Sequence, residues 1–359
     1  MRPNRRSFLA SLAAATTLPR LSWADVGSPA WLAAAAEPEG GYALYGLSAV
    51  GEARFRVPLP ARGHAATAHP ERPEAVAFAR RPGTFALVID CTSGAVLAQL
   101  TPPAGRQFNG HGAYSMDGSI LYTSEVVAEG SEGRIGLWDA SRGYARLAEW
   151  ETGGLGPHEI RRLPGRETLV VANGGIQTDP SDRRPLNLET MRANLTYLSP
   201  EGEIAERVEL APELAQNSIR HLALRPAGLV AFCMQWQGDP AEDVPLMGLH
   251  RQGVAPVLAT LPEAETFTMK GYAGSIAFDA GGARVAITSP KGGRVQIYSD
   301  TGAFLSSVLR TDVCGLGADA AGGFILTDGH GFIASTDGQS LTPLRQASCA
   351  WDNHLVALT

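Results

Sequence analysis

Short runs of apolar or alternating residues recur along most of the chain, and each run ends at a glycine, proline, aspartate or asparagine. Many contain β-branched or aromatic residues, as in Thr168-Leu-Val-Val-Ala and Arg294-Val-Gln-Ile-Tyr. Runs of this length and composition, bounded by turn residues, are typical of β-strands. No helical periodicity of comparable quality interrupts them, so the pattern predicts an all-β protein.

One short motif recurs at the start of a strand and identifies a repeat. Its clearest copies are His111-Gly-Ala-Tyr-Ser-Met-Asp-Gly, His158-Glu-Ile-Arg-Arg-Leu-Pro-Gly and His221-Leu-Ala-Leu-Arg-Pro-Ala-Gly. Seven first positions can be placed, at His64, His111, His158, His221, Ser275, Cys314 and Ser348. Their spacing of about 35 to 63 residues brackets the period of a four-stranded propeller blade. The repeat predicts a seven-bladed β-propeller of the WD40/YVTN-like type.

The two ends of the chain are expected to close the ring. The seventh copy ends after two expected strands, and Gly41-Tyr-Ala-Leu-Tyr-Gly and Ala53-Arg-Phe-Arg-Val can supply the missing pair. Joining the N-terminal strands to the C-terminal blade removes open sheet edges. We therefore expect one propeller domain over residues 41–359, preceded by a linker over 25–40. A pair of β-sandwiches is the alternative arrangement.

Composition agrees with many turns between strands. Glycine (41) and proline (24) are too frequent for a helical protein, but lack the larger excess typical of a disordered chain. The formal charge of −6 over 359 residues argues against a nucleic-acid-binding surface.

The N-terminus has the features of an export signal. Arg5 and Arg6 precede an apolar stretch from Leu9 to Leu18, and Ser22-Trp-Ala is a small-x-Ala cleavage site. These features predict a twin-arginine (Tat) signal peptide over residues 1–24 and a periplasmic protein. The apolar stretch is shorter than the roughly 20 residues that span a bilayer, so we expect no membrane span. Because Tat cargo is folded before export, often around a cofactor, a bound metal becomes more plausible.

Four histidines form the predicted metal site. In a propeller the first strand of each blade lines the central channel, so these histidines would meet at one channel mouth. Ser275, Cys314 and either Ser348 or Cys349 would hold the remaining positions, with His330 on a loop at the same end. Neutral imidazole suits Fe, Cu, Zn and Ni, and we expect an Fe or Cu ion. The predicted ligands are His64, His111, His158 and His221.

Neighbouring polar residues could orient these imidazoles. Glu159 and Arg220 flank two of the histidines, and Asn173 and Glu125 end neighbouring second strands. The competing interpretation is structural. WD-type blades hold a Gly-His histidine in a buried network with a Trp-Asp pair, and Gly110-His111 with Trp138-Asp139 fits that pattern.

The cysteines and one long loop leave further alternatives open. Cys91 and Cys233 lie within apolar runs and are expected to be packing thiols. Cys314 and Cys349 could form a disulfide in an oxidising compartment or act as ligands. Residues 173–192 form an unusually long connection. It could cover the channel and present Arg183 and Arg184 to an anionic ligand, or be an ordinary surface excursion.

At several of these segments the sequence resembles the DUF1513-type family of Tat-exported periplasmic β-propeller proteins, from about residue 40 to the end. The segments are Gln107-Phe-Asn-Gly-His-Gly, Gly156-Pro-His-Glu-Ile, Val171-Ala-Asn-Gly-Gly-Ile, Arg184-Pro-Leu-Asn-Leu-Glu-Thr-Met, Ser218-Ile-Arg-His-Leu, Gly271-Tyr-Ala-Gly-Ser and Trp351-Asp-Asn-His. Members are often encoded beside imelysin-type iron-uptake proteins and a dihaem oxidase-like protein. The resemblance implies a periplasmic role in iron acquisition with such partners, and it supplies no catalytic residues.

The leading functional hypothesis is a periplasmic propeller that binds a metal ion or a metal-containing ligand in iron or copper acquisition. A propeller enzyme, such as a lactonase or a quinoprotein-like oxidoreductase, and a non-catalytic docking scaffold are the alternatives. The sequence contains no Gly-x-Ser-x-Gly elbow and no Cys-x-x-Cys-His haem motif, so catalysis by an elbow serine or by covalently attached haem lacks support.

Overall fold

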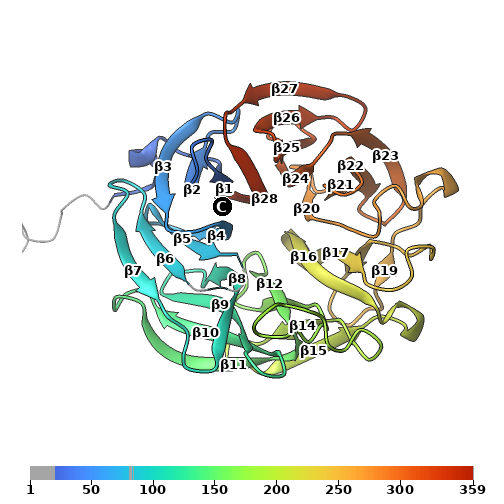
Figure 1. Cartoon of the computed structure of the whole chain (residues 1–359), viewed down its shortest axis with the longest axis horizontal. Helices are drawn as coiled ribbons and strands as arrows, with labels where there is room; N and C mark the ends of the chain where they lie inside the picture. Colours follow the sequence, from blue (N-terminus) through green and yellow to red (C-terminus); the bar gives the residue numbers. More distant parts are fainter. Residues whose placement is uncertain (1–20, 81–82, 84, 359) are drawn as a thin grey trace, which may run out of the picture.

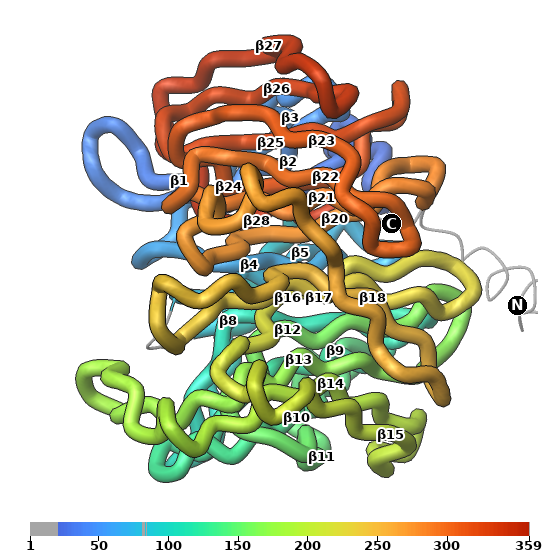
Figure 2. Tube along the Cα trace, turned by 90° about the vertical axis from the view of Figure 1, so that its right-hand side faces the viewer, coloured from blue at the N-terminus to red at the C-terminus, as the bar shows by residue number. Residues whose placement is uncertain are grey.

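Seven four-stranded antiparallel sheets are arranged around a central axis in the computed structural model (Figure 1). The structure describes residues 21–80, 83 and 85–358. Inner strands of successive sheets contact one another around the ring, which is therefore closed. Viewed edge-on, loops project from both faces of the ring (Figure 2). The predicted seven-bladed β-propeller is confirmed.

Each sheet contributes one strand to each of four concentric positions. The inner strands are β4 (Gly63–Ala68), β8 (Arg106–Tyr114), β12 (Pro157–Arg162), β16 (Asn217–Arg225), β20 (Ser275–Phe278), β24 (Val313–Ala318) and β28 (Ala350–Ala357). The second strands are β5 (Glu74–Ala79), β9 (Ile120–Val127), β13 (Leu169–Asn173), β17 (Leu229–Trp236), β21 (Arg284–Ser289), β25 (Phe324–Asp328) and β1 (Trp31–Ala36). The third strands are β6 (Ala86–Asp90), β10 (Glu132–Asp139), β14 (Asn194–Leu198), β18 (Met247–His250), β22 (Arg294–Ser299), β26 (Phe332–Thr336) and β2 (Tyr42–Leu47). The outer strands are β7 (Val96–Leu100), β11 (Ala145–Leu155), β15 (Ile204–Glu209), β19 (Val257–Leu258), β23 (Phe304–Leu309), β27 (Leu341–Gln346) and β3 (Ala53–Leu59).

Helical structure in the described residues is limited to short 3₁₀ turns. They are η1 (Trp23–Val26), η2 (Pro212–Leu214), η3 (Pro226–Gly228) and η4 (Glu263–Glu265). No helix in the described part of the chain is long and apolar enough to cross a membrane. Most of the predicted signal peptide, residues 1–20, lies outside the described residues, and the expected cleavage position after Ala24 falls within η1.

The ring closes in a sheet whose strand order is β28-β1-β2-β3. Both chain ends do share this blade, but the expected division of two strands from each end is wrong. Three strands come from the N-terminal side, and β1 lies within the segment 25–40 that was expected to be a linker. The Trp31-Leu-Ala-Ala-Ala-Ala run lacks β-branched residues and carries a weak strand signal. It is a strand because it fills the gap between β2 and β28.

Seven clusters of buried apolar side chains hold the sheets together, one at each interface between adjacent blades. In one of them Ala113 and Ile135 of one sheet pack with Ile160 and Val171 of the next. A pair of sandwiches would instead have one core between each pair of facing sheets. The continuous ring of cores excludes that alternative.

Candidate metal centre

A β-bulge interrupts the inner strand at or beside each of five histidines. The regular pairing breaks between Gly63 and Ala66, Phe108 and Gly112, Pro157 and Glu159, Ile219 and His221, and Trp351 and Leu355. A bulge removes a residue from the ladder and redirects its side chain. Of the two inner strands without a clustered histidine, β20 pairs with β21 without a register shift, whereas β24 has a shift between Val313 and Leu316. Irregular pairing therefore accompanies every clustered imidazole, and it also occurs at Cys314.

The five imidazoles of His64, His111, His158, His221 and His354 form one buried cluster. They come from five consecutive blades and are each at most 9% exposed. The His111 ring lies 4.9 Å from that of His64, 5.1 Å from that of His158, 5.6 Å from that of His221 and 5.0 Å from that of His354, measured between centroids. The other four rings follow one another at 4.6–5.8 Å. His111 is therefore the central member.

The donor geometry of this cluster fits a metal ion. Ligand nitrogens of His64, His111 and His158 lie within 4.8 Å of one another, as do those of His111, His221 and His354. Nitrogens bound at 2.0–2.1 Å to a tetrahedral ion are about 3.4 Å apart, so small side-chain rotations would close either set. The His354 Nε2 atom is buried and has no hydrogen-bond partner among the described residues. A ligand is one way to satisfy such an atom.

The electrostatics of the cluster favour neutral imidazole. Burial, followed by the neighbouring His221 and His64, holds the pKa of His354 well below its ordinary value. A histidine with a lowered pKa is uncharged at neutral pH and offers a nitrogen lone pair. His354 therefore carries the protonation state that a metal ligand requires.

The fifth histidine differs from the one that the sequence indicated. His330 lies on the β25–β26 turn of the sixth blade, as expected, but it is exposed, its amide donates to Asp328, and it belongs to neither set of clustered ligand atoms. The seventh inner position belongs to His354 on β28, not to Ser348 or Cys349. In most other copies a Pro-Gly, Asp-Gly or similar turn follows the first position and marks the register. Residues 355–359 contain no such turn, so this register signal is missing after His354.

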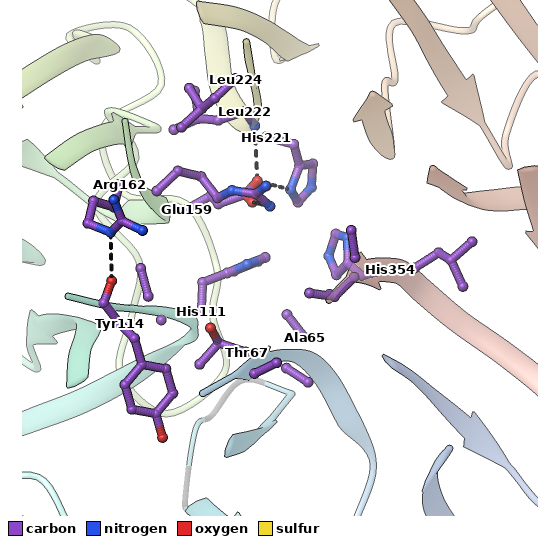
Figure 3. A pocket seen from close by; sticks show the side chains of 18 of the residues that line it. Ala65, Thr67, His111, Tyr114, Glu159, Arg162, His221, Leu222, Leu224 and His354 are labelled. Atoms are coloured by element: carbon purple, nitrogen blue, oxygen red, sulfur yellow. Dashed lines mark hydrogen bonds and ion pairs between the residues drawn. The ribbon is translucent and has the colours of Figure 1, made fainter. Parts of the chain in front are cut away.

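Glu159 orients one member of the cluster (Figure 3). Its Oε2 lies 3.2 Å from His221 Nδ1 and accepts from the Leu222 amide at 2.9 Å. Burial raises the pKa of Glu159, but the hydrogen bond from His221 and the charge of Arg161 lower it by more, so its pKa lies below the ordinary value. A carboxylate beside Nδ1 favours the tautomer with its proton on Nδ1, in which Nε2 is available as a ligand atom.

Glu159→Gln is expected to weaken metal binding roughly 10- to 100-fold, because the carboxylate that orients His221 and raises its basicity is lost. Titration of the metal-depleted protein with Cu²⁺ measures the effect. Glu149→Gln is the control, since Glu149 lies on the outer strand β11 and pairs with arginines instead of with a clustered histidine. Equal affinities of the Glu159→Gln and unchanged proteins would show that Glu159 has no role in positioning.

A hydrogen-bonded network of the kind found in WD-type blades lies around Trp138. Trp138 Nε1 donates to Thr123 Oγ1 at 2.9 Å, and Thr123 donates to Glu125 at 2.6 Å. Arg146 pairs with Glu125 at 2.6 Å and covers the Trp138 ring. Glu125 was expected to orient histidines; instead it belongs to this network within the blade, while His111 faces the channel.

The cluster separates two cavities. The larger, about 450 Å³, is lined by His111, His221 and His354 and extends toward the β12–β13 turn at Pro164 (Figure 3). The smaller, about 230 Å³, is lined by His64, His158 and His221. The histidines were expected at the channel mouth; they lie inside the channel, where a bound ion would be reachable from both sides.

Some of the remaining candidate residues lie beside the histidine cluster, and others lie away from it. Arg220 lines the smaller cavity together with Arg183 of the long loop. Arg184, the other arginine of this loop that the sequence offered to an anionic ligand, is exposed and lies 4.0 Å from Asp179. Asn173 is buried, and its Nδ2 donates to the Thr152 carbonyl, Asn194 Oδ1 and Thr196 Oγ1, none of which belongs to a clustered histidine. Arg184 and Asn173 therefore do not join the cluster.

The four cysteines are buried and free, so the structure contains no Cys314–Cys349 disulfide. Burial raises the pKa of all four thiols. Cys314 lies on the inner strand β24 but lines a different cavity, together with Asp312 and Asp352. It is not a member of either set of clustered ligand atoms found among the described residues.

Two solved structures share the architecture at low sequence identity. A Kuenenia stuttgartiensis hydrazine synthase chain is 13% identical, has a TM-score of 0.58, and the match covers 86% of this chain and 90% of that one. The Dos1 propeller is 10% identical, has a TM-score of 0.59, and the match covers 91% of this chain and 87% of that one. At such identities the likeness establishes the fold alone.

A comparison with curated proteins gives no match. A family model described as "Protein of unknown function (DUF1513)" matches residues 57–358, from the outer strand β3 to the end of the described chain. The match includes all seven inner strands and the five clustered histidines. The chain therefore belongs to the DUF1513 family.

Proposed function

We propose that the channel histidines bind one first-row transition-metal ion and that the protein serves iron or copper acquisition in the periplasm. The observation that carries this proposal is the convergence of five buried imidazoles from five blades. Burying five polar rings against one another has no packing advantage over apolar side chains, whereas imidazole is the commonest protein ligand of such metals. The carboxylate on His221 adds the second feature typical of metal-binding histidines.

The donor set narrows the choice of ion. Nitrogen ligands suit Cu, Fe, Zn and Ni, whereas Ca²⁺ and Mg²⁺ prefer oxygen. Copper binds most tightly among the divalent ions to a given nitrogen site. Iron is favoured by the genomic neighbourhood that the family resemblance implies. We therefore propose Cu or Fe as the cargo.

The cellular context of the proposal rests on the N-terminal sequence. Arg5-Arg6 and the following apolar stretch support export of the folded protein by the Tat route. Periplasmic iron-uptake proteins are the proposed partners, since they would receive or supply the ion.

Metal titration of the purified, chelator-treated chain tests the proposal. We expect about one equivalent of Cu²⁺, or of Fe²⁺ under anaerobic conditions, to remain bound after gel filtration, and no retention of Ca²⁺. Bound Cu²⁺ should show nitrogen couplings in its electron paramagnetic resonance spectrum. Failure to retain any of Cu, Fe, Zn or Ni in stoichiometric amounts would overturn the proposal.

A redox enzyme is the second candidate. The observation that favours it is the cavity on each side of the histidine cluster, which would give a small substrate access to a bound ion. Turnover in a dye-linked oxidation screen by the metal-loaded protein, lost in the metal-free protein, would favour catalysis over transport.

A further inference from the structure

The smaller cavity next to the histidines is strongly cationic. Arg80, Arg183 and Arg220 line it, from the end of β5, the long loop and β16 respectively. The other described lining residues are histidine, amide, hydroxyl and apolar side chains, with no aspartate or glutamate among them. Three arginines thus line one cavity of about 230 Å³, several times the roughly 30 Å³ occupied by a water in the liquid.

Arg220 is the unusual member of this group. Its side chain is buried, at 9% exposure, and its Nε has no hydrogen-bond partner among the described residues. Within the described ranges no carboxylate forms an ion pair with it. A buried cation without a counterion is costly and calls for an anionic partner.

Asp352, the acidic group that pairs with Arg80, is already engaged. Arg62 Nε lies 2.5 Å from Asp352 Oδ2, and Arg80 Nη1 lies 3.5 Å from Asp352 Oδ1. One carboxylate shared by two arginines leaves a net positive charge at this side of the cavity. Among the ion pairs of the described residues, Asp352 has Arg62 and Arg80 as partners and not Arg220.

Arg183 lies close to another cation of this group. Burial, followed by the charge of Arg80, lowers the pKa of Arg183. An anion placed between these guanidinium groups would relieve the repulsion.

We infer that this cavity is a binding site for a small oxyanion, either a carboxylate or a phosphate-like group, held by Arg80, Arg183 and Arg220. Guanidinium presents a planar fork of donors that matches the oxygen atoms of both groups. Gln235, Gln237 and Asn353 provide further polar groups around the cavity. The inference goes beyond the proposed metal binding, since the site requires no metal. His64, His158 and His221 also line this cavity, so an anion bound in it would lie beside the proposed metal-binding histidines.

Calorimetric titration of the metal-free full chain at low ionic strength tests this inference, with inorganic phosphate in one arm and malonate in the other. We expect one molecule of at least one anion per chain. Arg220→Gln should weaken its binding at least about 10-fold, since a charge-assisted bidentate contact is lost. Arg183→Gln should weaken it in the same direction. The matched control is Arg184→Gln, because Arg184 is the exposed neighbour of Arg183 in the same loop.

The two arms distinguish the source of the anion, and preference for malonate would indicate an organic acid. Arg220→Lys, which keeps the charge without the fork, should bind more weakly than the unchanged protein and more tightly than Arg220→Gln. If circular dichroism shows that Arg220→Gln is unfolded, the anion affinities of Arg183→Gln and Arg184→Gln are compared instead to test the inference. No binding by the folded protein, or equal affinities of Arg183→Gln and Arg184→Gln, would overturn the inference. Metal retention measured on the same samples reports separately on the proposed function.

Discussion

Replacing His111 by alanine should lower the affinity for Cu²⁺ by at least about 100-fold. His111 belongs to both sets of three ligand atoms, and its ring lies next to those of all four other clustered histidines. Its removal therefore breaks both possible sites at once. His354→Ala leaves His64, His111 and His158 in place, so its expected loss is smaller. Competition titration against a chelator of known affinity measures both changes.

Two other histidines serve as controls for this experiment. His330 is exposed on a turn, and His250 is buried with its Nδ1 bonded to Tyr197 at 2.7 Å. His330→Ala should bind Cu²⁺ as tightly as the unchanged protein, and His250→Ala should do so wherever circular dichroism shows it folded. An affinity of His111→Ala equal to that of His330→Ala would rule out the channel cluster as the metal site.

Glu125→Ala is expected to have the largest effect on stability, lowering the free energy of unfolding by about 3 to 5 kcal/mol. Glu125 is fully buried and pairs with Arg146 through both carboxylate oxygens, at 2.6 and 3.0 Å. Alanine would leave the Arg146 guanidinium without this partner and remove the acceptor of Thr123. Urea unfolding followed by circular dichroism measures the change.

Glu209→Ala provides the comparison, because Glu209 also pairs with an arginine, Arg207, at 3.4 Å but is 42% exposed. An ion pair of this exposure contributes about 0 to 1 kcal/mol, so the unfolding midpoint should move little. Similar destabilisation by the two substitutions would mean that burial does not control the strength of the Glu125 pair.

Much of the fold could be predicted from the sequence because the signals are local. Each strand is marked by its own apolar run and turn residues, and the repeated His-to-Gly motif indicates the inner strand of a blade. The motif also places His64, His111, His158 and His221 at corresponding positions, and the structure brings all four together. Corresponding positions on the inner strands of a closed ring all lie near its axis. The spacing of the repeat along the sequence therefore predicts which side chains come together.

The errors fall where no local signal exists. The Ala-rich β1 has weak strand propensity, and its pairing with β2 on one side and β28 on the other makes it a strand. His354 was missed because no turn follows it to mark the register. Arg183 and Arg184 are adjacent and chemically identical, and only the loop conformation decides which one lines the cavity.

The sequence by itself determined the strands, the sevenfold repeat and the histidine positions of four blades, because these depend on residue patterns within one repeat. Tertiary structure alone decided that His354 completes the cluster, that Glu159 holds His221, and that three arginines face one cavity. Each of these contacts joins residues of different blades. Their distances depend on ring closure and on the bulges that redirect the inner-strand side chains, and neither is encoded within a single repeat.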